Sequence, residues 1–296
     1  MKLNHIYVFL LLMWGLASSC IGEDYSDCNN RYVVNLSYTG DGTKEIFLDK
    51  IGCVQMYIFD EKNSCVHQTL LTKDEISSQQ TMLPPLEAGD YRIVFLGNPY
   101  STRVKDMSTR SALSHMCFGA ASYWNGQETP GNDSLYWASV DQSIEPFVPE
   151  RTETYNIAHF ASSHYDISVE VVGVHSAPKI VLTGVSPYTD FDNVAVSDIE
   201  TTYVLQTKYD GAFRTVAKCN ILRHLDHENV YLKVLDAEGK EMASVNFAQF
   251  LQENREHIDC SKNEVHIPFK IEFRSLSDVE VTLPDWLVLN VKPDFG

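Results

Sequence analysis

The sequence feature that most constrains the fold is a recurring alternation of apolar and mostly polar residues. In its clearest instance, alternate positions of one nine-residue run are apolar: Val265, Ile267, Phe269, Ile271 and Phe273. Successive side chains of a β-strand point to opposite faces, so such a run buries one face and exposes the other. Pro268 lies within the run and has no backbone N–H, so we expect an edge strand or a bulge there.

Further strand-like segments occur along the whole chain. They are residues 32–38, 54–58, 65–71, 89–98, 165–171, 230–235 and 242–245. The turn residues 60–63 join two of these segments into a hairpin that places Cys65 near Ile58. We therefore expect an all-β protein with few helices.

Two short helices are expected from their capping residues. Thr72 and Glu75 have the spacing of a capping box, in which each side chain binds the backbone N–H of the other residue. Asn246 precedes Phe247, Phe250 and Leu251, which have the spacing of one helix face. Residues 100–118 are expected to be helical or irregular.

The length of the chain favours two domains. Removing residues 1–19 from the 296 leaves 277 residues, which is more than one compact core usually holds. Pro146, Pro149 and the polar run 150–154 are typical of a linker. We expect β-sandwich domains at residues 29–147 and 148–296, each of which buries its own core and folds separately.

Residues 1–19 have the organisation of an export signal. Lys2 gives a basic start, and residues 6–16 form an apolar run broken only by Gly15. A run of about eleven residues is too short to cross the ~30 Å core of a bilayer as a helix, but it suits a signal peptide.

The end of this signal resembles the lipobox of bacterial lipoproteins. Ala17, Ser18 and Ser19 lead directly into Cys20. The resemblance implies cleavage before Cys20 and acylation of that cysteine, although Ala17 stands where a lipobox usually has leucine. The alternative is a plain secretory signal followed by a chance cysteine.

The charge of the chain restricts its partners. Its 23 basic and 40 acidic residues give a formal net charge of −17. This acidity argues against binding to nucleic acid or to an anionic membrane surface, so we expect membrane contact only through acyl chains. Residues 20–28 form an acidic tether whose Glu23 and Asp24 loosely resemble the signal that sends Bacteroidetes lipoproteins to the outer face of the outer membrane.

The remaining cysteines leave the disulfide pattern open. They are Cys28, Cys53, Cys65, Cys117, Cys219 and Cys260. Export permits disulfides, but the sequence does not choose among the pairings, and buried free thiols are an equal alternative. Their wide spacing argues against a zinc site.

The sequence has no catalytic motif. It lacks a nucleophile elbow, a phosphate loop, a dinucleotide fingerprint and a metalloprotease helix motif. The clusters at 224–228, 115–117 and 190–193 contain metal-ligand residue types without a recognised spacing, so we interpret them as polar loops and a turn. We expect no enzyme activity, cofactor, metal or small-molecule substrate.

Two stretches are candidates for binding. Aromatic residues between 117 and 137, including Tyr123, Trp124 and Trp137, could stack on sugar rings, but such residues more often close the end of a β-sandwich core. The final run 285–291 is apolar on both faces, which predicts an internal strand or one completed by another subunit. Its candidate docking residues are Trp286, Leu287, Val288 and Leu289.

Taken together, several segments resemble the FimB-type fimbrial anchor or accessory subunits of the Bacteroidetes. They are the lipobox with Asp27-Cys28, the strand 54–60, the strand 91–98, the segment 134–137 and the terminal run 281–288. The resemblance implies two transthyretin-like β-sandwich domains in tandem, a lipoprotein at the base or tip of a type V fimbria, shaft or accessory pilins as partners, and no catalytic residues. A surface glycan-binding lipoprotein is the alternative.

The position of Arg31 favours a retained anchor over a polymerising pilin. Pilins of the wider superfamily lose an N-terminal strand to an arginine-directed protease. Between residues 20 and 44 the only arginine is Arg31, which precedes the first expected strand. Cleavage there would leave that strand attached.

We predict that replacing Cys20 with serine releases the protein from the membrane, because the acyl chains would have no attachment site. Cell fractionation with an antibody against the protein measures this, and metabolic labelling with a palmitate analogue reports acylation. A Cys28→Ser variant is the matched control and should remain membrane-bound. Continued membrane retention and labelling of Cys20→Ser would contradict the prediction.

Overall fold

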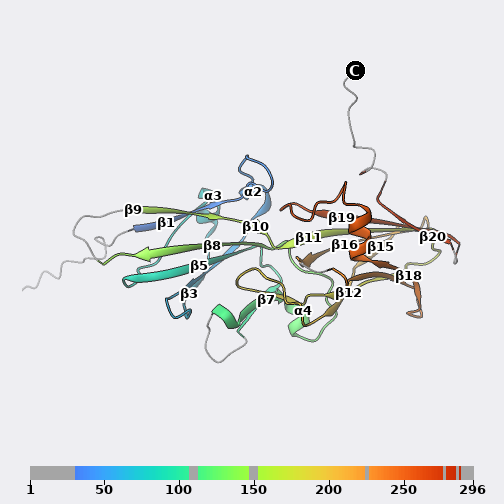
Figure 1. Ribbon diagram of the computed structural model, residues 1–296, viewed down its shortest axis with the longest axis horizontal. Coiled ribbons are helices and arrows are strands. Elements are labelled where there is room, and N and C mark those ends of the chain that lie inside the picture. The colour runs from blue at the N-terminus through green and yellow to red at the C-terminus, as the bar shows by residue number, and fades with distance from the viewer. Residues whose placement is uncertain are drawn as a thin grey trace, which may run out of the picture.

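The computed structural model describes residues 31–106, 113–146, 153–223, 227–275, 278–284 and 287, and these form an elongated, mainly β protein (Figure 1). The first half contains β1 (Arg31–Ser37), α2 (Phe47–Lys50), β2 (Val54–Phe59), β3 (Cys65–Leu70), α3 (Lys73–Ser78), β4 (Gln80–Met82), β5 (Gly89–Gly97), β6 (Thr102–Asp106), η2 (Leu113–His115), β7 (Met116–Ala120), α4 (Ala121–Trp124), β8 (Tyr136–Ile144), β9 (Glu153–His159) and β10 (Ala161–Ser162). The second half contains β11 (His164–Val172), β12 (Lys179–Val185), β13 (Tyr188–Asp190), β14 (Thr201–Val204), β15 (Thr207–Tyr209), β16 (Arg214–Leu222), β17 (Tyr231–Leu235), β18 (Glu241–Asn246), α5 (Phe247–Glu253), β19 (His266–Ser275) and β20 (Asp278–Thr282). The expected all-β fold class is confirmed.

In the first half, the sheet β4-β1-β9 packs on the sheet β10-β8-β5-β2-β3. Their facing side chains form one core, with Val34 and Leu36 of β1 against Met56, Ile58 and Phe95 of the other sheet. β1 lies between β4, which is antiparallel to it, and β9, which is parallel to it. The first strand is therefore the centre of its sheet.

In the second half, the sheet β15-β16-β11-β19-β20 packs on the sheet β14-β12-β17-β18. The core contains Ile167 of β11, Phe269 of β19 and Leu232 of β17, and α5 contributes Phe247 and Phe250. The outer positions of β19 are more exposed, as the alternating pattern predicts.

Both predicted helix caps are present. The Thr72 side chain accepts a hydrogen bond from the Glu75 N–H (3.3 Å), and the Thr72 N–H donates to the Glu75 carboxylate (2.7 Å). Asn246 caps α5 through the Gln249 N–H at 2.9 Å. The predicted hairpin of β2 and β3 also forms, with Cys65 opposite Phe59.

Pro268 is not on an edge strand, contrary to the sequence-based expectation. β19 lies between β11 and β20, and Pro268 is opposite Ser168 of β11. On the other side, the pairing with β20 extends only from Lys270 to Ser275. Pro268 is tolerated because the neighbouring strand does not reach it, so no ladder bond there needs its missing N–H.

The join between the halves also differs from the expectation. β9 lies beyond the expected boundary at residues 147 and 148, but it pairs with β1 from Arg31↔Glu153 to Ser37↔His159. The next residues pair with β8 as β10, and the chain enters the second half at β11. Residues 153 and 154 are polar because they begin a largely exposed strand, and this polarity resembled that of a linker.

Residues 100–118 contain two strands that were not expected. β6 and β7 pair with each other, and β13 of the second half pairs with β7, so the three form a sheet that spans both halves. All five residues of β7 are buried, so this strand shows no alternation of polarity. At Gly119, where β13 crosses, a Cβ atom would overlap the carbonyl oxygen of Pro187.

This third sheet covers the second face of β2 and β5 and creates a third core. Tyr57 and Phe59 of β2 pack there with Phe118 of β7 and with Phe191 and Leu222 of the second half. The Phe191 ring meets the rings of Tyr57, Phe59 and Phe118 edge to face at centroid distances of 5.0, 5.7 and 5.9 Å. Residues of both halves build this core. The expectation that each half buries its own core and folds separately did not include it.

We predict that Phe191→Ala destabilises the whole protein by about 3–5 kcal/mol, because it removes a buried ring shared by both halves. Denaturant titration followed by near-UV circular dichroism measures the loss. Leu48→Ala is the control, because Leu48 is 55% exposed, and it should cost less than about 0.5 kcal/mol. A loss of the same small size for Phe191→Ala would show that the third core contributes little.

Candidate functional site

The junction of the halves contains an extended network of polar contacts. One side is the turn at Asp41, whose carboxylate accepts hydrogen bonds from the N–H groups of Asn263 (2.8 Å) and Glu264 (3.0 Å). Glu264 in turn accepts from Lys50 Nζ at 2.5 Å and from the Tyr38 hydroxyl. Burial and the Glu264 carboxylate raise the pKa of Tyr38, so its hydroxyl remains a proton donor.

Arg223 binds the loop 259–264 on the side opposite the Asp41 turn. Its guanidinium donates to the carbonyl oxygens of His164 (3.2 Å), Cys260 (3.4 Å), Lys262 (2.6 Å) and Asn263 (2.5 Å). It also lies 4.7 Å from the centroid of the Tyr165 ring. Sequence reasoning missed this residue, because its acceptors are backbone carbonyls that leave no sequence pattern.

His164 and Asp166 continue this network into β11. The His164 ring is buried, with Nδ1 2.9 Å from the Leu135 carbonyl oxygen and Nε2 3.5 Å from the Asp166 carboxylate. Burial alone would raise the pKa of Asp166, but the hydrogen bond and charge of His164, together with the charges of His266 and Lys50, outweigh it and hold that pKa below its usual value. These contacts join the end of the first half to the start of the second.

The loop 125–134 of the first half reaches into the second half. Thr129 bridges to Tyr203 of β14, and the Val204 N–H donates to the Thr129 carbonyl at 2.8 Å. The Asn132 side chain donates to the Tyr203 hydroxyl at 2.5 Å, and its N–H donates to the Asn220 carbonyl at 2.8 Å. The loop therefore pairs with the edge strand β14 at Thr129.

The three aromatic residues considered for glycan contact pack against the protein. Trp124 stacks on Tyr188 of β13 (5.0 Å) and has the Lys105 ammonium 4.7 Å from its ring centroid. Tyr123 meets the edge of Trp124 at 4.9 Å. Trp137 donates from Nε1 to the Phe191 carbonyl at 3.1 Å and packs against the third core. This packing leaves no open row of aromatic faces.

The metal-ligand clusters considered from the sequence do not assemble in the described part of the chain. No group of three or more His, Cys, Asp or Glu residues there could hold a metal ion, and residues 224–226 lie outside it. Asp190 behaves as a turn residue, because its carboxylate accepts the N–H groups of Asp192 (2.9 Å) and Val194 (2.8 Å).

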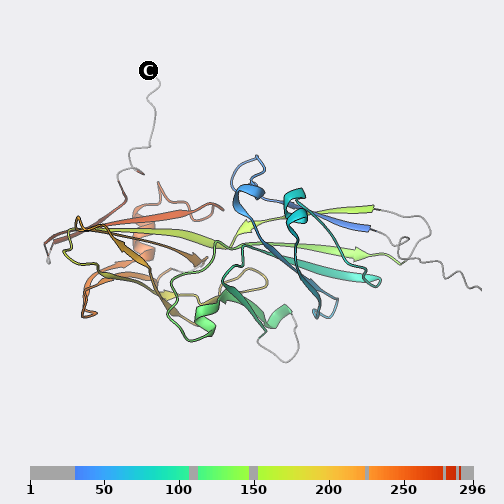
Figure 2. The same ribbon diagram turned by 180° about the vertical axis from the view of Figure 1, so that it is seen from behind.

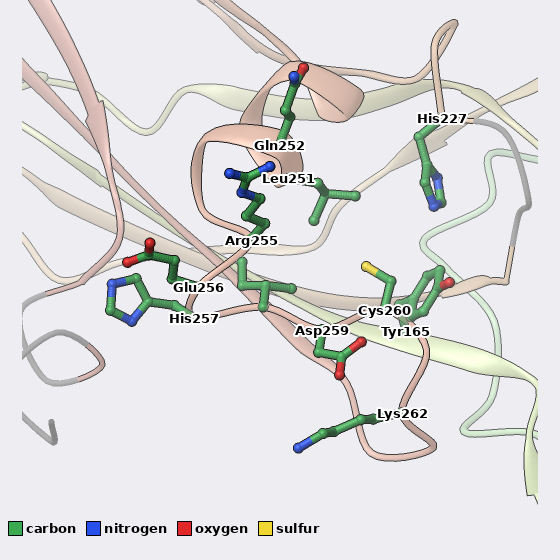
Figure 3. Close-up of a pocket in the computed structure, with 11 residues that line it drawn as sticks. Tyr165, His227, Leu251, Gln252, Arg255, Glu256, His257, Asp259, Cys260 and Lys262 are labelled. Carbon is green, nitrogen blue, oxygen red and sulfur yellow. The ribbon is translucent and has the colours of Figure 1, made fainter.

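A cavity of about 770 Å³ lies in the second half (Figure 3). α5 and the segment after it form one wall, and Tyr165 and His227 contribute to the other side. The charged ends of Arg255, Glu256 and Lys262 point in different directions (Figure 3). A second cavity of about 600 Å³ also borders Tyr165 and Cys260 and includes the apolar segment 194–196. Neither presents a convergent catalytic set.

Among the described cysteines, Cys53, Cys219 and Cys260 are free thiols, and Cys20 and Cys28 lie outside the described residues. The Cys65 and Cys117 thiols donate to the carbonyl oxygens of His67 (3.5 Å) and Lys105 (3.6 Å). Burial raises the pKa of Cys219 to about 12, with a further contribution from the Asp166 carboxylate, so this thiol is unreactive.

Most of the expected docking strand falls outside the described residues. Trp286, Val288 and Leu289 are not described, but Leu287 packs against the second core and its N–H donates to the Pro284 carbonyl at 3.0 Å. Among the helices of the described ranges, none is long and apolar enough to span a bilayer.

These observations define a class of protein: tandem β-sandwiches joined by a polar and aromatic junction, without an assembled catalytic or metal site in the described residues. Solved structures share the fold. The fimbrial anchor protein Mfa2 of Porphyromonas gingivalis is 14% identical, with a TM-score of 0.64 over 86% of this chain and 98% of that one. A candidate adhesin of Bacteroides ovatus is 13% identical, with a TM-score of 0.70 over 87% and 95%.

A candidate polysaccharide-binding protein of Bacteroides thetaiotaomicron has a TM-score of 0.65 at 12% identity, over 82% of this chain and 91% of that one. A comparison with curated protein sequences found no match. The family model described as fimbrillin-A associated anchor proteins Mfa1 and Mfa2 matches residues 25–292. The chain belongs to this family, so it is a structural or adhesion subunit of a fimbria.

We predict that Arg223→Ala destabilises the protein by about 1–3 kcal/mol, because four backbone carbonyls, three of them in part-buried contacts, would lose a charged donor. Arg223→Lys should recover only part of the loss, since one ammonium cannot reproduce the planar fork. Denaturant titration measures both. Arg214→Ala is the control, because Arg214 forms exposed pairs with Glu170 and Asp210, and it should cost less than about 1 kcal/mol. Equal losses at both arginines would contradict this role for Arg223.

Proposed function

We propose that this protein is an outer-membrane lipoprotein, held by acyl chains on Cys20, that anchors or caps a fimbria by strand pairing with another subunit. Family membership carries the fimbrial part of the proposal. The run of residues 17–20 carries the lipid part, and the acidic tether supports exposure on the cell surface. The protein turns over no substrate in this role.

The position of β1 supports a retained subunit over a polymerising one. Val34, Leu36 and Tyr38 are at most 2% exposed, and β1 is paired on both sides. Loss of this strand would uncover the first core, at roughly 25 cal/mol for each Å² of apolar surface exposed. Cleavage after Arg31 would leave residues 32–38 in place and cut only the connection to Cys20.

The joint to the next subunit is proposed to use the terminal run 285–291. A strand added to a sheet gains backbone hydrogen bonds along its length and places alternate side chains in pockets. Leu287, the described member of the run, packs against the second core, so the run begins close to the sandwich. A joint of this kind needs no chemistry.

Glycan binding is the second candidate, since a protein of the same fold is named as a candidate polysaccharide-binding protein. Trp124 packs on Tyr188 and under Lys105, which weighs against glycan binding by this aromatic residue. A glycan array with the purified protein tests it. Tight binding that Trp124→Ala abolishes would favour this second function.

We predict that truncation after Pro284 abolishes surface fimbriae while the first half remains folded. Electron microscopy of cells and limited proteolysis of the purified protein measure the two effects. The matched control removes only residues 293–296, which leaves the run 285–291 intact, and should keep normal fimbriae. Normal fimbriae after the longer truncation would exclude the run 285–291 as the joint. Loss of fimbriae in the control variant as well would show that assembly does not depend specifically on this run.

A further inference from the structure

One side of β19 is only partly covered by a neighbouring strand. β20 pairs with residues 270–275 of β19, toward the tip of the second half (Figure 1). On the other side, β11 pairs with residues 266–272. Residues 266–269 of β19 therefore have β11 on one side, and no strand of the described ranges pairs with them on the other.

A backbone hydrogen bond shows which residues of β19 face this open side. The Asp166 N–H of β11 donates to the Val265 carbonyl at 3.0 Å. The backbone groups of alternate residues in a strand point to the same neighbour. Val265 and Ile267 therefore face β11. The even-numbered residues, which include Pro268 and Lys270, face the side on which β20 lies.

The register of β20 would place a second proline opposite Pro268. Lys270 is opposite Thr282, and the one irregularity of this pairing lies at its other end, after Phe273. Two residues further along the two strands are Pro268 and Pro284. An antiparallel pair of this parity exchanges two N–H···O=C bonds. Because proline has no N–H, a Pro268–Pro284 pair would form neither bond, and β20 ends before it.

The residue after Pro284 adds a second obstacle. In the same register Asp285 would lie opposite Ile267, which is fully buried in the second core. Opposite residues of two paired strands share a face, so the Asp285 carboxylate would point toward the core. A charge that points inward opposes the extension of a sheet edge. The chain instead turns after Pro284, whose carbonyl accepts the Leu287 N–H at 3.0 Å.

We propose that Pro268, Pro284 and Asp285 together block the terminal run 285–291 from pairing with its own sheet, and so keep this run available to the sheet of another subunit. The inference rests on the proposed function, in which the run is the joint. A run that is apolar on both faces favours the interior of a sheet, and the open side of β19 lies directly ahead of β20. Without the block, the run would be held against its own sandwich and could not reach a partner.

Hydrogen exchange of the purified chain from residue 21, which retains every described residue, tests the block without any partner. We expect the amides of residues 285–291 to exchange quickly in the unmodified chain. The triple variant Pro268→Val, Pro284→Val and Asp285→Val restores the missing donors and removes the inward charge. β20 can then extend, and the exchange of these amides should slow by at least about tenfold.

The chain offers a matched control. Pro293→Val with Asp294→Val removes a second Pro-Asp dipeptide, which lies beyond the terminal run, and should leave the exchange unchanged. The double variant Pro284→Val with Asp285→Val keeps Pro268, so one of the two bonds is still missing and the exchange should slow by less than in the triple variant. If circular dichroism shows the triple variant to be unfolded, the double variant decides the test.

Counts of surface fimbriae separate this proposal from the proposed function. The triple variant should reduce fimbriae as truncation after Pro284 does, and the control should keep them. Slower exchange with normal fimbriae would support the block and exclude the run as the joint. Unchanged exchange in the folded variants, or exchange that is already slow in the unmodified chain, overturns the block.

Discussion

The packing of Phe191 into the first half is the interaction on which the arrangement of the molecule depends. Its ring fills the space between β2 and β7 and touches three aromatic rings of the other half. The reciprocal contact is the loop 125–134, which carries first-half residues to the edge of β14. Each half thus completes a surface of the other, and the orientation between them is fixed by a core rather than by a linker.

The chain itself supports this rigidity. β9, β10 and β11 follow one another from residue 153 to residue 172 with single-residue gaps, and they run from the first sandwich into the second (Figure 2). Along this path the chain pairs successively with β1, β8 and β16. A spacer that holds partners at a set distance benefits from such a continuous extended segment, because little free backbone remains in which to bend.

The sequence predicted those parts of the fold in which one face of a strand meets water. β1, β11 and β19 alternate in burial, and the two capped helices are coded by neighbouring residues. Residues 89–98 were predicted as a strand, but burial on both of its faces was not. The run Ile93-Val94-Phe95-Leu96 of β5 is buried throughout because the strand β7 and Phe191 cover its second face, and both are distant in sequence. Arg223 was missed for a related reason, since long-range bonds to carbonyls impose no local spacing.

The parallel pairing of β1 with β9 has a mechanical consequence for the proposed role. Cys20 precedes the start of β1, and the end of β9 leads into the second half. Tension between a tether at one end and a partner at the other would draw these two strands past each other along their length. Their seven paired residues, from Arg31↔Glu153 to Ser37↔His159, would then bear the load together rather than peel apart one after another. In the proposed role, the first sheet would therefore carry the load in shear.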